Sequence, residues 1–200
     1  MSTSRPRTEA IRSLSRESFE DFCKYFWECM PGVPPLLWNW HLSLFCTELQ
    51  YVAERVFLGK EKEHDLLANV SPGTSKSSIW SILFNCWALA RMPSIRFIVA
   101  SNTERLVLDL AYKTKMVLEH EFYRQCFPEV QIQADRSAKG DFATSAGGER
   151  LSCTVGGQSP IGRHAHFIVC LPAESVIITD RGEFPIGEIV DNKLDVRVLS

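Results

Sequence analysis

The chain has 200 residues, which is enough for one ordinary domain or for part of a larger protein. Its composition is 45% hydrophobic and its formal net charge is −2, so it describes a globular chain and offers no general electrostatic argument for binding nucleic acid. The seven cysteines show neither CxxC nor Cys/His spacing, so no zinc site or disulfide framework is indicated. The sequence has no signal-peptide core and no run of membrane-spanning length, so we expect a cytoplasmic protein without membrane contact.

Residues 1–60 predict a helical N-terminal region. Apolar side chains recur at helical spacing over residues 15–30, where Ser15 or Ser18 is available as a cap, and the PGVPPLL segment ends this helix. A second amphipathic helix is predicted over residues 41–57, followed by a charged turn.

Strands and helices alternate over residues 61–169. In chain order we expect a strand at 66–70, a largely buried helix at 75–92, a strand at 95–101, a long helix at 102–127 capped by Asn102 or Thr103, short strands and turns at 130–157, and a core strand at 164–169. Strands separated by helices are typical of a mostly parallel sheet, so this range predicts a three-layer α/β fold.

Residues 170–200 form a different pattern. They alternate between apolar and polar side chains, contain glycines at turn positions and show no helical period. This pattern predicts short antiparallel strands and places a domain boundary between Val169 and Cys170.

A candidate phosphate-binding loop lies in the segment NVSPGTSKSSIW, between a predicted strand and a predicted helix. In such a loop the backbone of Gly73, Thr74 and Ser75 surrounds the phosphates of ATP, Lys76 sits between the β- and γ-phosphates, and the Ser77 hydroxyl binds Mg²⁺. The glycine that usually precedes the lysine is Ser75 here. The alternative is a turn that caps a helix, with Lys76 merely solvated.

Four segments, taken in order and spacing, resemble the ATPase domain of phage terminase large subunits: NWHLSLFCTELQYV, LLANVSPGTSKSS, FIVASNTERLVLDL and GGERLSCTVGGQSPIGRHAHFIV. The resemblance covers residues 35–169 and implies an incomplete P-loop NTPase fold, with ATP and Mg²⁺ as cofactors. It also implies a DNA-packaging motor that forms a ring of identical subunits and acts with double-stranded DNA, the portal and the small terminase subunit in the host cytoplasm. In this family the phosphate loop often lacks its last glycine.

The resemblance also implies roles for individual residues. Trp40 and His41 match the motif on the adenine side of the nucleotide, although His41 stands where many relatives have glutamine. Core packing is the alternative role for both residues. Arg150 and Arg163, in the loops before the last strand, are candidates for the arginine that stabilises the transferring phosphoryl group. A surface arginine is the alternative for each.

The strand HFIV departs from the family pattern, because terminases continue this strand into an acidic pair and here Cys170 follows Val169. The segment CLPAESVIITDRGEFPIGEIV resembles the first block of an intein, the N-terminal part of a Hint domain. The resemblance implies that Cys170 attacks the carbonyl of Val169 and forms a thioester. The alternative is a buried thiol in a strand that turns at Leu171.

The residues after Val169 are too few for a whole splicing domain, so we expect either a truncated sequence or a naturally split intein, and we favour the split intein. Splicing in trans would then join residues 1–169 to a C-terminal terminase fragment and restore the acidic pair. The alternatives are a P-loop ATPase or helicase fragment that does not splice, and a decayed nucleotide-binding protein.

Overall fold

The computed structural model describes residues 4–70, 73–101, 103–138, 140–154, 164–170, 176–179 and 181–185. The helices are α1 (Ser4–Glu17), α2 (Phe19–Phe26), η1 (Trp27–Cys29), α3 (Trp40–Phe57), η2 (Ser78–Leu83), α4 (Phe84–Arg91), α5 (Glu104–Glu119) and α6 (Glu121–Cys126). The strands are β1 (Arg96–Ser101), β2 (Ile132–Ser137), β3 (Phe142–Thr144), β4 (Glu149–Thr154), β5 (Phe167–Val169), β6 (Val176–Thr179) and β7 (Gly182–Pro185).

The protein is a mixed α/β structure built on a five-stranded sheet of order β2-β3-β4-β1-β5. Strand β1 runs parallel to both β4 and β5, whereas β3 runs antiparallel to β2 and to β4. The sheet is therefore mixed and not mostly parallel as expected. The antiparallel strands are joined by short turns, which a parallel pair does not allow.

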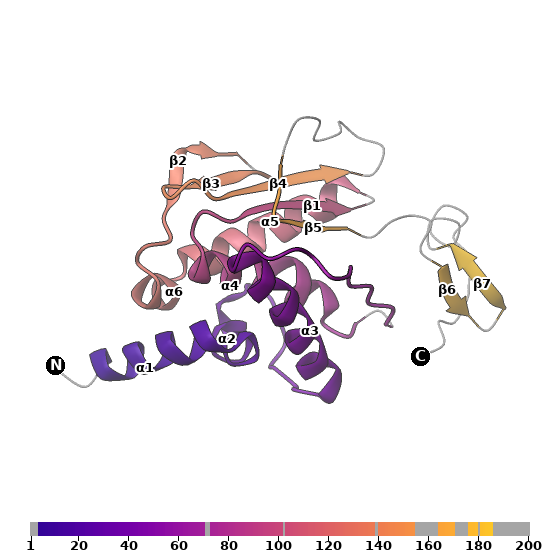
Figure 1. Cartoon of the computed structure of the whole chain (residues 1–200), viewed down its shortest axis with the longest axis horizontal. Helices are drawn as coiled ribbons and strands as arrows, with labels where there is room; N and C mark the ends of the chain where they lie inside the picture. Colours follow the sequence, from indigo (N-terminus) through magenta and orange to yellow (C-terminus); the bar gives the residue numbers. More distant parts are fainter. Residues whose placement is uncertain are drawn as a thin grey trace.

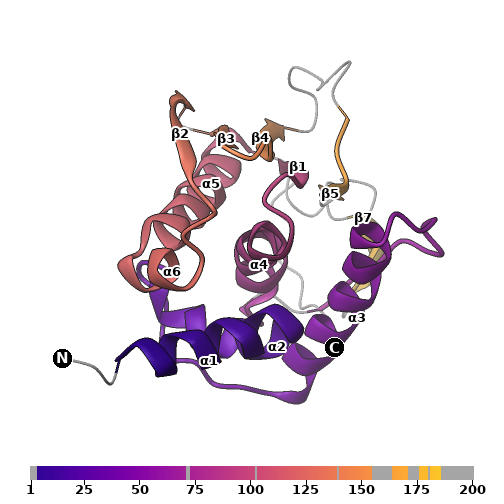
Figure 2. The ribbon, with the colours of Figure 1, turned by 60° about the vertical axis from the view of Figure 1, so that its left-hand side comes forward.

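The described helices lie on one face of the sheet (Figures 1 and 2). On that face Phe97 of β1 and Phe167 of β5 pack against Phe84, with ring centroids 5.9 and 5.0 Å away. On the opposite face Ile168 is 68% exposed. The described residues thus form two layers, and the expected third layer is not among them.

Helices α1 and α2 form where the sequence provides a cap between them. Ser18 has extended backbone angles, and its hydroxyl accepts a hydrogen bond from the backbone N–H of Asp21, which makes it the N-cap of α2. Ser15, the other candidate cap, is buried within the preceding helix. That helix, Ser4–Glu17, was not predicted. Gln50 of α3 fixes the junction, because its side-chain oxygen accepts from the N–H of Phe19.

One continuous hydrophobic core joins the N-terminal helices to the sheet region, across the expected boundary at residue 60. Trp87 is fully buried at its centre, 5.0 Å from the ring of Phe19, and its indole N–H donates to the carbonyl of Ser15 at 2.9 Å. Burying aromatic rings of this size contributes much of the favourable free energy of folding, and pairing the indole N–H avoids the cost of burying a bare donor.

Two predicted elements differ in the structure. The long helix expected at 102–127 is interrupted at His120, which ends α5 and whose ring Nδ1 accepts from the N–H of Phe122 to cap α6. Thr103 is the N-cap of α5, and the other candidate, Asn102, lies outside the described residues. The segment 66–70 is not a strand, because a strand requires a neighbour and no described strand pairs with it.

Strands β6 and β7 pair with each other as an antiparallel two-stranded sheet, with Thr179 opposite Gly182. This confirms the antiparallel strands expected after Cys170, while the assignment of this region to an intein stays a prediction. Of the helices in the described ranges, none is long and apolar enough to cross a membrane.

Candidate functional site

The candidate phosphate loop is a tight turn leading into a helix. Gly73 has a φ of +83° and Ser75 a φ of +61°, so both lie in the left-handed region. A helical segment starts at Lys76 and Ser77 and continues through η2 and α4, and the N–H of Ile79 donates to the carbonyl of Ser75 at 3.0 Å. Glycine reaches a positive φ without strain, whereas a serine there costs about 1 kcal/mol or more. Such strain is concentrated at functional sites.

This geometry suits an anion. The first N–H groups of a helix have no partner within the helix, and the helix dipole places partial positive charge at the same end. A left-handed residue just before the helix turns neighbouring N–H groups toward a common point, which makes an anion-binding concavity. The segment after Ser77 is π-helical, a form that is frequent at functional sites.

His41 lies against this loop although it is far away in sequence. Asn39 caps α3 by accepting from the N–H of Trp40, which holds His41 in the first helical turn. The His41 ring Nε2 is 3.3 Å from the carbonyl oxygen of Thr74 and donates to it when Nε2 carries the proton. The structure therefore brings one residue of the predicted adenine-side motif to the predicted phosphate loop.

Trp40, the other residue of that motif, is 73% exposed. The exposure excludes the core-packing alternative for this side chain, because a core tryptophan would be buried. Its ring lies 6.1 Å from His41 in an edge-on arrangement. An exposed indole beside the loop leaves an aromatic face free for a planar ligand.

Burial lowers the pKa of Lys76 below its ordinary range. A partly buried ammonium group lacks part of its hydration, and a bound anion would compensate for that loss. Among the described residues no group of three His, Cys, Asp or Glu side chains is placed to hold a metal ion.

Arg150 belongs to strand β4 and is fully buried, so it is neither the loop residue nor the surface residue that the sequence suggested. Its Nη1 donates to the carbonyl of Gly140 and to the hydroxyl of Ser152, and burial lowers its pKa to about 10. These bonds anchor it to the sheet and not to the loop at 73–77. Arg163 lies outside the described residues, so its role stays a prediction.

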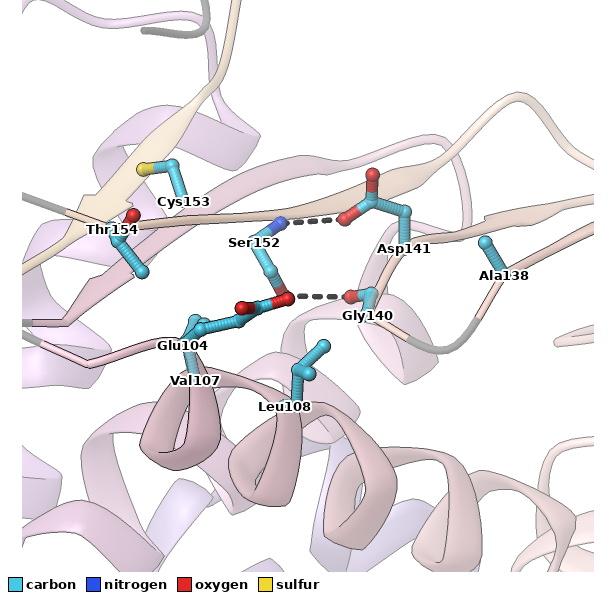
Figure 3. Close-up of a pocket in the computed structure, with 9 residues that line it drawn as sticks. All are labelled: Glu104, Val107, Leu108, Ala138, Gly140, Asp141, Ser152, Cys153 and Thr154. Carbon is cyan, nitrogen blue, oxygen red and sulfur yellow. Dashed lines mark hydrogen bonds between the residues drawn. The ribbon is translucent and has the colours of Figure 1, made fainter. Parts of the chain in front are cut away.

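A cavity of about 400 Å³ lies between the start of α5 and the end of β4 (Figure 3). Three of its lining residues are bonded to one another, since Asp141 accepts from the N–H of Ser152 and the Ser152 hydroxyl donates to the carbonyl of Gly140, both at 2.7 Å. The carboxylates of Glu104 and Asp141 line it. Two negative charges oppose phosphate, so the loop at 73–77 is the better anion site.

The junction between Val169 and Cys170 lies at the carboxyl end of β5. Val169 pairs with Val99 of β1 and packs against the core, whereas Cys170 is exposed. Its exposure excludes the alternative of a buried structural thiol. The peptide bond between these residues therefore joins an anchored acyl group to an accessible sulfur.

The other cysteines are less accessible than Cys170. Burial raises the pKa of Cys29 to about 12 and that of Cys126 to about 11, so their thiols stay protonated. Cys153 of β4 is half-buried, and burial followed by the charge of Cys170 raises its pKa. The sequence did not predict this neighbour. The strand register explains it, because Cys153 lies opposite Ala100 and Cys170 follows the residue opposite Val99.

No protein-family model, no curated protein and no solved structure matches this chain.

Proposed function

We propose that the chain is the N-terminal part of a phage terminase large subunit, an ATP-driven DNA-packaging motor, carrying the N-terminal segment of an intein from Cys170 onward. The observation that carries the proposal is the exposed Cys170 directly behind core strand β5, followed by a separate two-stranded sheet. A core strand that ends at an accessible thiol, where the resembling family places metal-binding carboxylates, fits an interrupted catalytic motif.

The chemistry at the junction is an acyl shift. The Cys170 thiolate attacks the carbonyl carbon of Val169, the carbon–nitrogen bond breaks, and the nitrogen takes up a proton to become the free amino group of Cys170. The acyl group of residues 1–169 is then held as a thioester on the sulfur. Only the thiolate is nucleophilic, so an accessible, solvated thiol is better suited to this step than the buried ones.

In the completed motor the loop at 73–77 would hold the phosphates of ATP. Lys76 would contact the β- and γ-phosphates and Ser77 would ligate Mg²⁺, while His41 keeps the loop against α3 through Thr74. Splicing in trans would place the partner's residues directly behind Val169 and supply the acidic pair. The ligated subunit would act in a ring with the portal, the small subunit and double-stranded DNA in the host cytoplasm.

The test combines the chain with the polypeptide from a downstream reading frame of the same genome that begins within an intein and ends in a nuclease domain. We call this the complementary polypeptide. We expect a ligated product containing residues 1–169, and in the presence of a small thiol the release of residues 1–169 alone. Cys170→Ala should abolish both products and Cys153→Ala should retain them. An intact Val169–Cys170 bond in the mixture would refute the proposal.

A second candidate is a nucleotide-binding protein that does not splice. The contact between His41 and Thr74 and the left-handed turn at Ser75 favour it, because they require only the loop. It predicts ATP binding that is lost in Lys76→Ala, together with a Val169–Cys170 bond that survives every partner. Titration with a fluorescent ATP analogue, alongside the ligation assay, separates the two.

A further inference from the structure

Two buried cysteines, Cys23 of α2 and Cys46 of α3, lie in contact inside the core. Their exposed fractions are 0% and 1%, and the Cys46 thiol donates to the Cys23 sulfur at 3.8 Å. Among the described residues no other two cysteine sulfurs are in hydrogen-bond contact. The sulfur atoms of a disulfide are about 2 Å apart, so these two atoms need to approach each other by only about 2 Å.

The register of the two helices fixes this contact. The backbone N–H of Phe19 in α2 donates to the side-chain oxygen of Gln50 in α3 at 2.8 Å, and the Gln50 amide donates to the carbonyl of Glu17 at 2.7 Å. Cys23 lies four residues after Phe19, whereas Cys46 lies four residues before Gln50. Four residues make about one helical turn, so the two contacts follow each other along an antiparallel helix pair. The hydrogen bonds of Gln50 therefore hold the two sulfurs opposite each other.

We propose that Cys23 and Cys46 form a reversible disulfide under oxidising conditions, and that this bond locks α2 to α3. The inference is independent of the proposed function, because it uses neither the phosphate loop nor the junction at Cys170. In a reducing compartment the glutathione pool keeps both thiols reduced. A rise in the concentration of small disulfides oxidises them.

The bond forms by two thiol–disulfide exchanges, with a low-molecular-weight disulfide as the oxidant. The thiolate of one cysteine attacks a sulfur of the oxidant, forms a mixed disulfide and releases one small thiol. The other cysteine then attacks the mixed disulfide, forms the bond between Cys23 and Cys46 and releases the second small thiol. The two protons of the cysteine thiols end on the two small thiols. The cysteine pair thus loses two electrons and the oxidant gains them.

Burial controls the rate of the first exchange. Burial, and next the hydrogen bond from Cys46, raise the pKa of Cys23, so this thiol stays protonated while the helices are closed. Local separation of α2 from α3 admits the oxidant, and the return of the Gln50 contacts brings the sulfurs together for the second exchange. The bond closes a loop around residues 24–45, which include the PGVPPLL segment. Such a cross-link restricts the unfolded chain and so stabilises the folded one.

Equilibration in a glutathione buffer tests the pairing. The full-length chain is held with reduced and oxidised glutathione in urea below the unfolding transition, so that local opening does not limit the reaction. It is then alkylated, digested and mapped by mass spectrometry. We expect an intramolecular cross-link between the peptides that contain Cys23 and Cys46, with the loss of two hydrogen atoms. Recovery of these two cysteines as alkylated thiols or as glutathione adducts would overturn the inference.

Urea unfolding gives a second measurement. Cys170→Ser removes the exposed thiol, and in this background we expect the oxidised chain to unfold at a urea concentration about 1–2 M above that of the reduced chain. A reductant should return the midpoint to the lower value. An unchanged or lower midpoint in a chain that carries the mapped cross-link would show that the bond distorts the helix pair, and the lock would be refuted.

Cys46→Ala and Cys29→Ala are matched variants, because each removes one buried thiol. Cys46→Ala should lose the rise of the midpoint on oxidation, whereas Cys29→Ala should keep it. Each variant is compared with its own reduced form, so a loss of stability caused by the substitution itself does not enter the result, and the mapping of the original chain needs no variant. A rise that survives in Cys46→Ala would assign the disulfide to another pair and contradict the inference.

Discussion

The aromatic core and the β5 side of the molecule differ in how far their side chains are exposed. In the core the indole N–H of Trp87 and the hydroxyl of Tyr123 both donate to backbone carbonyls at 2.9 and 2.8 Å, and the rings pack on one another. On the β5 side Ile168 and Leu67 are mostly exposed. The buried core therefore provides most of the stability of the fold, while the exposed side carries the proposed chemistry.

The core and the β5 side should differ most in how fast their thiols react. At neutral pH we expect a maleimide to label Cys170 on the order of 10³ times faster than Cys29 or Cys126, because buried thiols react only through opening reactions that cost several kcal/mol. Peptide mapping by mass spectrometry measures each rate. Cys170→Ser should remove the fast phase and leave the slow ones. Fast labelling of Cys29 in the native protein would show that the core is not closed.

The free energy of unfolding should depend strongly on side chains of the core and weakly on side chains of the β5 side. Trp87→Ala leaves a large cavity among packed rings and should lower the free energy of unfolding by about 3–5 kcal/mol. Ile168→Ala removes a side chain that is already exposed and should change it by less than about 0.5 kcal/mol. Urea unfolding followed by circular dichroism gives both values. Equal losses would mean that the β5 side is as well packed as the core.

Local sequence patterns correctly predicted the helices and strands whose formation depends mainly on their own residues. Periodicity gave α3 and β1 within a few residues, since an amphipathic face or a run such as Phe97–Ser101 needs no distant information. Residues 66–70 have an equally clear alternation and are not a strand, because a ladder needs a partner that the pattern does not contain. The same limit applies to the sheet, whose parallel and antiparallel pairs depend on long-range pairing.

The candidate site was predictable in its residue types and not in its contacts. A left-handed φ at Gly73 follows from the properties of glycine, but the same conformation at Ser75 does not. The approach of His41 to Thr74 depends on how α3 packs beside the loop. Arg150 illustrates the opposite error, because a charged residue was expected near solvent and the sheet buries it against Gly140 and Ser152.

We expect a smaller effect on the free energy of unfolding from substitutions in the phosphate loop, residues 73–77. Ser75→Gly should raise the free energy of unfolding by up to about 1 kcal/mol, since glycine adopts the left-handed conformation without strain. Ser77→Gly is the matched control, because Ser77 has a helical φ of −64° and glycine there should lower stability by about 0.5–1 kcal/mol. Urea titration distinguishes the signs. Equal changes in the two variants would show that Ser75 is not strained.

The smallest effect that we expect is a dependence of the free energy of unfolding on pH, caused by His166 just before β5. The ring Nδ1 of His166 accepts a hydrogen bond from the N–H of Arg96 at 3.0 Å, which requires the neutral ring. Burial, and next the charge of Arg96, lower the pKa of His166, so its folded-state value lies below the ordinary value of about 6.5. The contribution to stability is complete above pH 6.5 and is lost as the pH falls through the folded-state pKa.

His166→Asn provides the control, since its amide oxygen accepts a hydrogen bond without titrating. We expect the free energy of unfolding of the original chain to fall faster between pH 7 and pH 5 than that of the variant. Exchange of the Arg96 amide should accelerate in the same interval, after correction for intrinsic rates. Identical pH profiles in the two proteins would mean that the start of β5 is held by its backbone pairing with β1 alone.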